Sequence, residues 1–73
     1  MNQQDIQTEP IDLTKREKTV LNLLAQGKPN KEIASALMLS GNTIRSNLKC
    51  IYAKLGARTR GETIVWALQH LKP

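Results

Sequence analysis

The chain has 73 residues, a formal net charge of +5 at neutral pH, one cysteine and one histidine. A chain of this length forms one domain with a modest core. Cys50 and His70 alone allow no internal disulfide and no cysteine-rich zinc site. The sequence also offers no nucleophile–base pair, carboxylate dyad or glycine-rich phosphate loop. We therefore expect a protein that is not an enzyme and that uses no cofactor.

The positive charge is concentrated in the body of the chain. Residues 1–14 contain three acidic side chains and no lysine or arginine, so the remainder carries +8. A basic body behind an acidic segment is typical of nucleic-acid-binding proteins, although many basic proteins are merely soluble. The sequence has no apolar run that would indicate a signal peptide or a membrane span. We expect a cytoplasmic protein with no membrane partner.

The chain starts with a polar stretch, residues 1–12, that has no hydrophobic periodicity. We expect a flexible acidic tail there, followed by one domain over residues 13–73. The first predicted helix covers about residues 14–26. Thr14 and Glu17 have the spacing of a capping box, in which each side chain accepts a hydrogen bond from the other residue's amide. The inward positions of this helix are Val20, Leu21 and Leu24.

A second, shorter helix is predicted over about residues 30–38, after Gly27 has ended the first helix. Asn30 is expected to cap its start. Its inward positions are Ile33, Ala34 and Leu37. Ser40 is a suitable cap for a third helix over about residues 40–55.

The third predicted helix has two contrasting faces. Its apolar face consists of Ile44, Leu48, Ile51 and Leu55. The opposite face, which is polar and cationic, consists of Asn42, Arg45, Ser46, Lys49 and Ala53. Thr43, Asn47 and Lys54 lie on the flank between them. The polar, cationic face suits the major groove of DNA. Alternatively, it is the solvated face of an ordinary amphipathic helix. Two short helices joined by so tight a turn form a helix-turn-helix arrangement, whose second helix enters the groove.

The fourth predicted helix covers about residues 59–71 and completes an all-α fold. Thr59 and Glu62 have the spacing of a second capping box. The inward positions are Ile64, Ala67 and Leu71. Val65 and Trp66 fall toward the other side, where a large aromatic side chain indicates a partner. Alternatively, Trp66 lies folded along the edge of the domain.

Several short motifs follow one another in a characteristic order along these four helices. They are Leu13-Thr14-x-Arg16-Glu17, Val20-Leu21-x-Leu23-Leu24-Ala25-x-Gly27, Asn30-Lys31-Glu32-Ile33-Ala34, Leu37, Ser40-x-x-Thr43-Ile44-Arg45, Ile51, Lys54-Leu55-Gly56, Arg60 and Ala67. Together, over about residues 13–71, they resemble the LuxR-type (GerE-like) helix-turn-helix family of DNA-binding domains, in a free-standing form. The resemblance implies a four-helix bundle and a sequence-specific, double-stranded-DNA-binding transcription regulator. The chain departs from the family at Pro29, Asn47 and Ala57, where Ser or Thr, His and Val are usual.

The resemblance also implies roles for individual side chains. Arg45, Ser46 and Lys49 match base-facing positions, and Asn42 lies on the same face of the helix. Lys31, Thr43 and Asn47 match positions near phosphates, and Lys54 joins them on the flank. An arginine such as Arg45 can pair with two acceptors of guanine. Glu17 and Arg60 match positions that we interpret as structural.

One such module alone would bind DNA weakly, so we expect a homodimer on an inverted repeat. The expected contact is the fourth helix, through Val65, Trp66 and Gln69. The alternative is a small interaction protein, an anti-regulator that pairs with a larger family member through the same helix. The two hypotheses differ in whether the Arg45 and Lys49 face is needed. RNA polymerase is a further candidate partner, and the DNA-bound protein would be associated with the nucleoid.

Overall fold

The computed structural model describes residues 12–71, which form four α-helices and no strand. The helices are α1 (Lys15–Ala25), α2 (Asn30–Leu37), α3 (Gly41–Leu55) and α4 (Arg60–His70). The predicted all-α, four-helix fold is confirmed, and every helix begins and ends within one residue of its predicted limits. The predicted tail lies outside the described residues except for Asp12. None of the described helices is long and apolar enough to cross a membrane.

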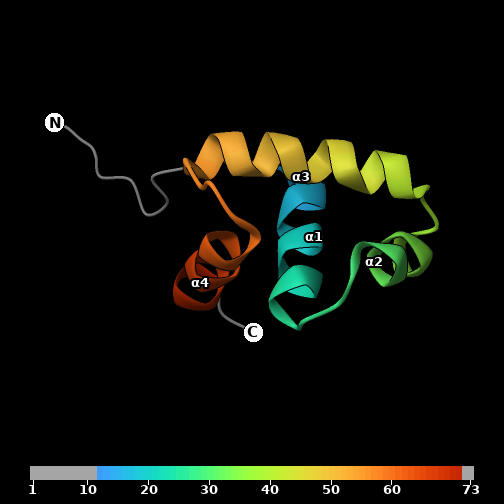
Figure 1. Cartoon of the computed structure of the whole chain (residues 1–73), viewed down its shortest axis with the longest axis horizontal. Coiled ribbons are helices and arrows are strands. Elements are labelled where there is room, and N and C mark those ends of the chain that lie inside the picture. Colours follow the sequence, from blue (N-terminus) through green and yellow to red (C-terminus); the bar gives the residue numbers. More distant parts are fainter. Residues whose placement is uncertain (1–11, 72–73) are drawn as a thin grey trace, which may run out of the picture.

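The longest helix, α3, lies along one side of the molecule, and α1 runs away from its middle (Figure 1). The other two helices flank α1, with α2 on one side and α4 on the other. α1 contacts all three of its neighbours. This arrangement covers one side of α3 with α1 and α2 and leaves its opposite side uncovered within the described chain.

The ends of α1 and α3 follow the predicted local chemistry. At the start of α1 the Glu17 amide donates to Thr14 Oγ1 at 3.0 Å, and the Thr14 amide donates to Glu17 Oε1 at 2.9 Å. At the start of α3 the Thr43 amide donates to Ser40 Oγ at 3.1 Å. Gly27 and Gly56 follow α1 and α3 with φ of +88° and +69°, a left-handed conformation that glycine adopts without strain.

The predicted cap of α2 is wrong. Pro29 occupies the N-cap position and makes no side-chain hydrogen bond there, and Asn30 is the first helical residue. The Asn30 side chain is engaged elsewhere, because its Oδ1 accepts a hydrogen bond from Arg60 Nη1 at 2.8 Å. Arg60 Nη2 also donates to the Lys28 carbonyl at 2.9 Å. The Arg60 guanidinium therefore joins the start of α4 to the start of α2 and to the loop between α1 and α2.

The second predicted capping box is half correct. The Glu62 amide donates to Thr59 Oγ1 at 3.1 Å, as expected. The Glu62 carboxylate, however, accepts from the Arg58 amide at 2.7 Å and not from the Thr59 amide. Thr59 has φ −133°, whereas Thr14, which heads the complete box, has φ −71°. The difference in φ changes the direction of the Thr59 amide. The Glu62 carboxylate therefore accepts from the amide of the preceding residue, Arg58.

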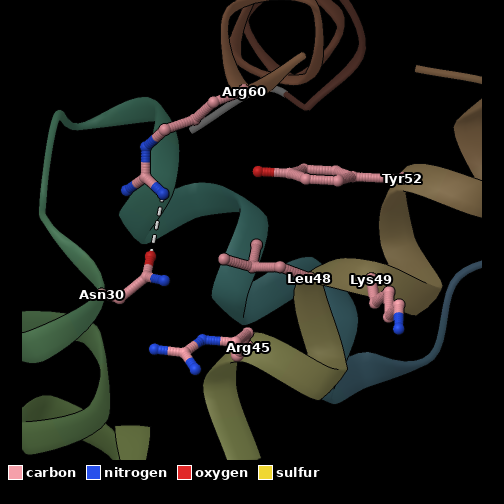
Figure 2. A pocket seen from close by; sticks show the side chains of 6 residues that line it. All are labelled: Asn30, Arg45, Leu48, Lys49, Tyr52 and Arg60. Atoms are coloured by element: carbon pink, nitrogen blue, oxygen red, sulfur yellow. Dashed lines mark hydrogen bonds between the residues drawn. The ribbon is translucent and has the colours of Figure 1, made fainter. Parts of the chain in front are cut away.

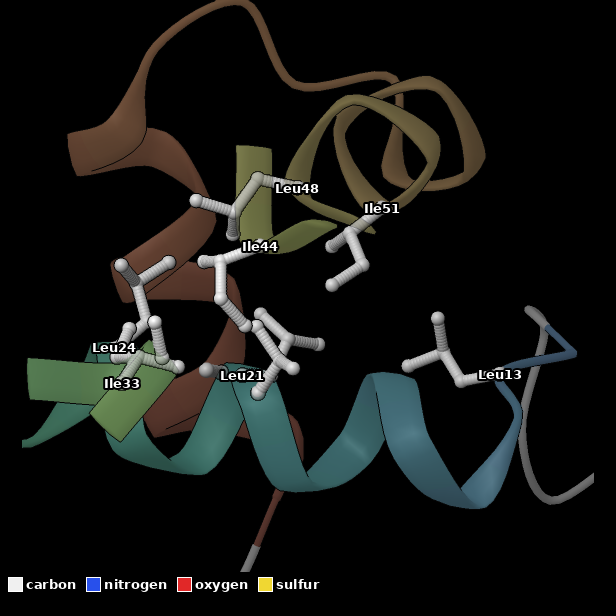
Figure 3. Packing of buried hydrophobic residues seen from close by; sticks show 10 residues of the cluster. Leu13, Leu21, Leu24, Ile33, Ile44, Leu48 and Ile51 are labelled. Atoms are coloured by element: carbon white, nitrogen blue, oxygen red, sulfur yellow. The ribbon is translucent and has the colours of Figure 1, made fainter. Parts of the chain in front are cut away.

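The core lies where α1 meets the inner sides of the other helices (Figure 3). Its buried apolar members are Leu13, Val20, Leu21, Leu24, Ile33, Ala34, Ile44, Leu48, Ile51 and Ala67. Each large aliphatic side chain buried in this way contributes about 1.5–3 kcal/mol. In α4 the fully buried positions are Thr63 and Ala67, whereas the predicted inward residues Ile64 and Leu71 are half-buried. Thr63 is tolerated there because its hydroxyl donates to the Thr59 carbonyl at 3.1 Å.

The turn between α2 and α3 passes through Met38, which has φ +58°. A left-handed conformation costs a residue other than glycine about 1–2 kcal/mol. The following amide, that of Leu39, donates to the Ala34 carbonyl at 2.9 Å, which closes the end of α2. Met38 itself is 91% exposed. The turn therefore brings α3 directly after α2, in the predicted helix-turn-helix arrangement.

Candidate nucleic-acid interface

The outward face of α3 carries all four side chains that we predicted to read bases. Asn42, Arg45, Ser46 and Lys49 are exposed. Their orientation follows from the other side of the helix, where Ile44, Leu48 and Ile51 are at most 3% exposed and fix its rotation. The Ser40 cap fixes where the helix starts. α3 is thus a rigid support with a polar, cationic surface.

The two cations on this face have no partner within residues 12–71. Neither the Arg45 guanidinium nor the Lys49 ammonium forms a hydrogen bond or an ion pair with a described residue. Exposed cations of this kind attract phosphate groups, and an arginine can also donate two hydrogen bonds to a guanine edge. The outward face of α3 can therefore bind an anionic partner without first breaking an internal contact among these residues.

Two of the predicted phosphate-binding residues, Lys31 and Thr43, are exposed in the first turns of α2 and α3. Lys31 lies in the first turn of α2, where no side chain caps the helix. The amides of Asn30 and Lys31 have no partner among the described residues, whereas the Glu32 amide donates to the Pro29 carbonyl at 2.9 Å. Phosphate is favoured near such free amides. The Thr43 hydroxyl shares a hydrogen bond of 2.9 Å with Ser40 Oγ.

The other two predicted phosphate-binding residues are differently placed. Asn47 is half-buried, and its Nδ2 is a buried nitrogen with no hydrogen-bond partner. Lys54 Nζ forms an ion pair with Glu17 Oε1 at 2.7 Å and donates to the Asp12 carbonyl at 3.1 Å. Lys54 therefore joins the end of α3 to the start of α1, and a phosphate would have to compete with Glu17 for it.

The same ion pair affects the titration of Glu17. The hydrogen bond from Lys54 lowers the pKa of the Glu17 carboxyl, and the hydrogen bond from the Thr14 amide lowers it further. Burial of the carboxyl opposes both effects. Glu17 is thus held as a carboxylate that caps α1 and binds α3 at once. Its structural role agrees with our interpretation of the sequence, but the contact with Lys54 was not foreseen.

A hollow of about 270 Å³ opens beside the cationic face of α3 (Figure 2). It is lined by Asn30, Arg45, Leu48, Lys49, Tyr52 and Arg60. Tyr52 was missed by the sequence analysis, although it lies seven residues after Arg45 and three after Lys49 and so shares their side of the helix. The hollow itself could not be foreseen, because its walls come from the starts of α2 and α4 as well as from α3.

On α4, the outward residues differ in part from those predicted. Val65 is 53% exposed and Gln69 is also exposed. Trp66 is half-buried against the core, and its ring stacks on His70 with the centroids 4.3 Å apart. Leu68 is 62% exposed and was missed, although it follows Val65 at a helical spacing of three. The apolar surface of α4 is therefore formed chiefly by Val65 and Leu68.

Comparison with known proteins identifies the family of this chain. The sequence model of the family described as bacterial regulatory proteins, luxR family, matches residues 12–67. The chain belongs to the LuxR family. It is 41% identical over 69 residues to the spore germination protein GerE of Bacillus subtilis (strain 168), covering 94% of this chain and 92% of GerE. Members of this family are transcription regulators that bind DNA.

Longer relatives match through one part of their length. The CsgBAC operon transcriptional regulatory protein of Escherichia coli (strain K12) is 38% identical over 65 residues, which cover 89% of this chain but 30% of that protein. Among solved structures, the Vibrio cholera VqmA–ligand–DNA complex matches with a TM-score of 0.76 and 31% identity. The match covers 92% of this chain and 29% of the VqmA chain. The LuxR-type fold predicted from the sequence is therefore confirmed.

Proposed function

We propose that this LuxR-family chain is a sequence-specific regulator of transcription that inserts α3 into the major groove of double-stranded DNA. The observation that carries the proposal is the outward face of α3, whose cations Arg45 and Lys49 have no partner among the described residues. The major groove is about 12 Å wide and admits one α-helix. The family membership and the DNA complex of the VqmA relative support DNA as the partner.

Within this proposal the side chains divide by their position. Arg45, Lys49, Ser46 and Asn42 face the base edges, where Arg45 pairs with a guanine. Lys31 and Thr43 contact phosphates at the rim, as do Asn47 and Lys54 once the latter leaves Glu17. Phosphate contacts set the position of the helix on the duplex, and base contacts set the preferred sequence.

The proposed active species is a homodimer on an inverted repeat. A single module buries little surface on DNA, and a second recognition helix multiplies both affinity and selectivity. Two modules related by a two-fold axis would read half-sites about one helical turn apart. The exposed Val65 and Leu68 on α4, with Gln69 beside them, form a surface that can pair with its own copy.

The same α4 surface supports a second candidate function. An anti-regulator would pair with a larger family member through Val65 and Leu68 and would not need the cations of α3. Such a protein would prevent the partner from binding DNA.

Selection of bound sites from random duplex DNA by the purified protein tests the proposal. We expect enriched sites that contain an inverted repeat with a guanine at a fixed place in each half. The double variant Arg45→Ala/Lys49→Ala, with both changes on the exposed face, should enrich no such motif while remaining folded by circular dichroism. Failure of the wild-type protein to enrich any motif, together with capture of a full-length family regulator, would favour the anti-regulator instead.

A further inference from the structure

The hollow beside α3 combines an apolar floor with polar and cationic walls. Leu48 and the ring of Tyr52 form apolar surface, and Arg45 and Lys49 lie along the α3 side. The opposite wall is the Arg60–Asn30 pair, whose guanidinium–amide hydrogen bond is 2.8 Å long. Figure 2 shows the Tyr52 hydroxyl directed into the space between α3 and this pair. A ligand with both an apolar and an anionic part suits these walls.

Several polar groups at the hollow are available to a ligand. The Tyr52 hydroxyl has no hydrogen-bond partner among residues 12–71, and neither do the charged ends of Arg45 and Lys49. Arg60, in contrast, is fixed by two hydrogen bonds to neutral oxygen atoms, so its positive charge is not neutralised by a carboxylate. A hydroxyl donor and fixed positive charge around one space favour a phosphate group.

The size of the hollow limits what can occupy it. Its volume of about 270 Å³ falls just below the range of roughly 300–1,000 Å³ that holds drug-sized molecules. It is also continuous with the face of α3 that we propose for the major groove, because Arg45 and Lys49 belong to both. A sugar–phosphate unit is small enough, and the backbone at the edge of the groove would pass close by.

We propose that this hollow holds one sugar–phosphate unit of the bound DNA backbone. The deoxyribose packs on the Tyr52 ring and Leu48, and the phosphate accepts a hydrogen bond from the Tyr52 hydroxyl in the field of Arg60 and Lys49. This inference rests on the proposed function and adds Tyr52 to the interface. Because phosphate contacts set the register of a recognition helix, Tyr52 positions Arg45 over its base.

Replacing single backbone phosphates by uncharged methylphosphonates tests the proposal. The duplex is the selected site, with one phosphate per half-site neutralised at a time. Wild-type protein should lose affinity at several positions. Tyr52→Phe, which removes only the hydroxyl, should bind the unmodified duplex on the order of tenfold more weakly. At one of the neutralised positions, Tyr52→Phe should lose less affinity than the wild type does, because the phosphate at that position is the one that the Tyr52 hydroxyl binds. Ser35→Ala removes an exposed hydroxyl on α2 and should match the wild type on every duplex.

The outcomes separate this inference from the proposed function. If Tyr52→Phe matches the wild type on all duplexes while Arg45→Ala loses affinity, the hollow does not hold a sugar–phosphate unit, and the proposed function stands. If the folded wild type binds no selected duplex, the function itself fails. A titration of ¹⁵N-labelled protein with thymidine 5′-monophosphate tests whether the hollow binds a free nucleotide instead of the DNA backbone. Saturable shifts around Tyr52, combined with no effect of Tyr52→Phe on DNA, would assign the hollow to a soluble nucleotide and overturn the backbone proposal.

Discussion

Arg60 connects three parts of the fold, and its removal should weaken the whole domain. Its guanidinium donates to Asn30 Oδ1 at 2.8 Å and to the Lys28 carbonyl at 2.9 Å. A hydrogen bond that involves a charged group contributes about 1.5–3 kcal/mol, and partial exposure of these contacts places each nearer the lower end. Arg60→Ala should therefore lower the free energy of unfolding by about 3 kcal/mol. In a domain of this size, that corresponds to a Tm decrease of roughly 12–24 °C.

Thermal and urea denaturation of the full chain, followed by circular dichroism, measures this effect. Arg58→Ala is the matched control, since Arg58 is exposed and its contact to Glu62 uses the backbone amide, which alanine retains. Arg60→Lys should recover only part of the stability, because an ammonium cannot reach both acceptors with the geometry of a guanidinium. In a double-mutant cycle, Arg60→Ala and Asn30→Ala should cost less together than the sum of their separate effects. A Tm for Arg60→Ala within a degree or two of the Arg58→Ala value would refute the reasoning.

The remaining predictions concern DNA binding, pH and assembly. Arg45→Ala should lower specific affinity by about 1–3 kcal/mol and relax preference at one base pair, whereas Lys31→Ala should weaken all duplexes alike and reduce the salt slope by about one. Titrations on site and non-site duplexes at several salt concentrations distinguish the two, and equal losses on both duplexes for Arg45→Ala would contradict its role. Because Glu17 has a lowered pKa in the folded state, it stabilises the fold above its unfolded pKa, and this contribution should disappear as the pH falls through and below about 4.5. By urea denaturation, Glu17→Gln should have a lower free energy of unfolding than the wild type at pH 7, and this free energy should fall less toward pH 3. An unchanged dependence of the free energy of unfolding on pH would count against the ion pair. Leu68→Glu should abolish cooperative binding to an inverted repeat, by gel shift, while single half-site binding persists; unchanged cooperativity would exclude this face of α4. Leu68 is a better test than Trp66, because Trp66 is half-buried and a charge there would also disturb the core.

The features that could be predicted from the sequence are those whose causes are local. Thr14 and Glu17 are three residues apart, and their reciprocal hydrogen bonds follow from that spacing. The two faces of α3 follow from the helical repeat, so the spacing of the apolar residues was enough to predict that Arg45 and Lys49 are exposed. Gly56 ends α3 because its left-handed φ is available to glycine at little cost.

The features that escaped prediction depend on how the helices pack. Arg60 and Asn30 are 30 residues apart, and Lys54 and Glu17 are 37 apart, so no local pattern indicates either pair. The prediction that Asn30 caps α2 was wrong for this reason. Its side chain accepts a hydrogen bond from the distant Arg60 guanidinium and does not cap the helix. The hollow beside Tyr52 likewise requires three elements to meet. For Trp66 the sequence left two positions open, outward toward a partner or along the domain edge, and the half-buried ring that stacks on His70 agrees with the second.

The basic side chains around α3 divide according to what they bind within the chain. Lys54 and Arg60 each have two oxygen partners among the described residues, at distances between 2.7 and 3.1 Å, and both join segments that are remote in sequence. Arg45 and Lys49 have none there, although all four lie on or beside the same helix. Lys54 ties the end of α3 to the start of α1, whereas Arg60 joins α4 to the segment at Lys28 and Asn30. The unpaired Arg45 and Lys49 leave the outward face of α3 positive. A rigid helix that presents uncompensated charge loses little conformational freedom when an anionic duplex binds. The Lys54–Glu17 ion pair thus contributes to the fixed position of α3 that the proposed interaction requires.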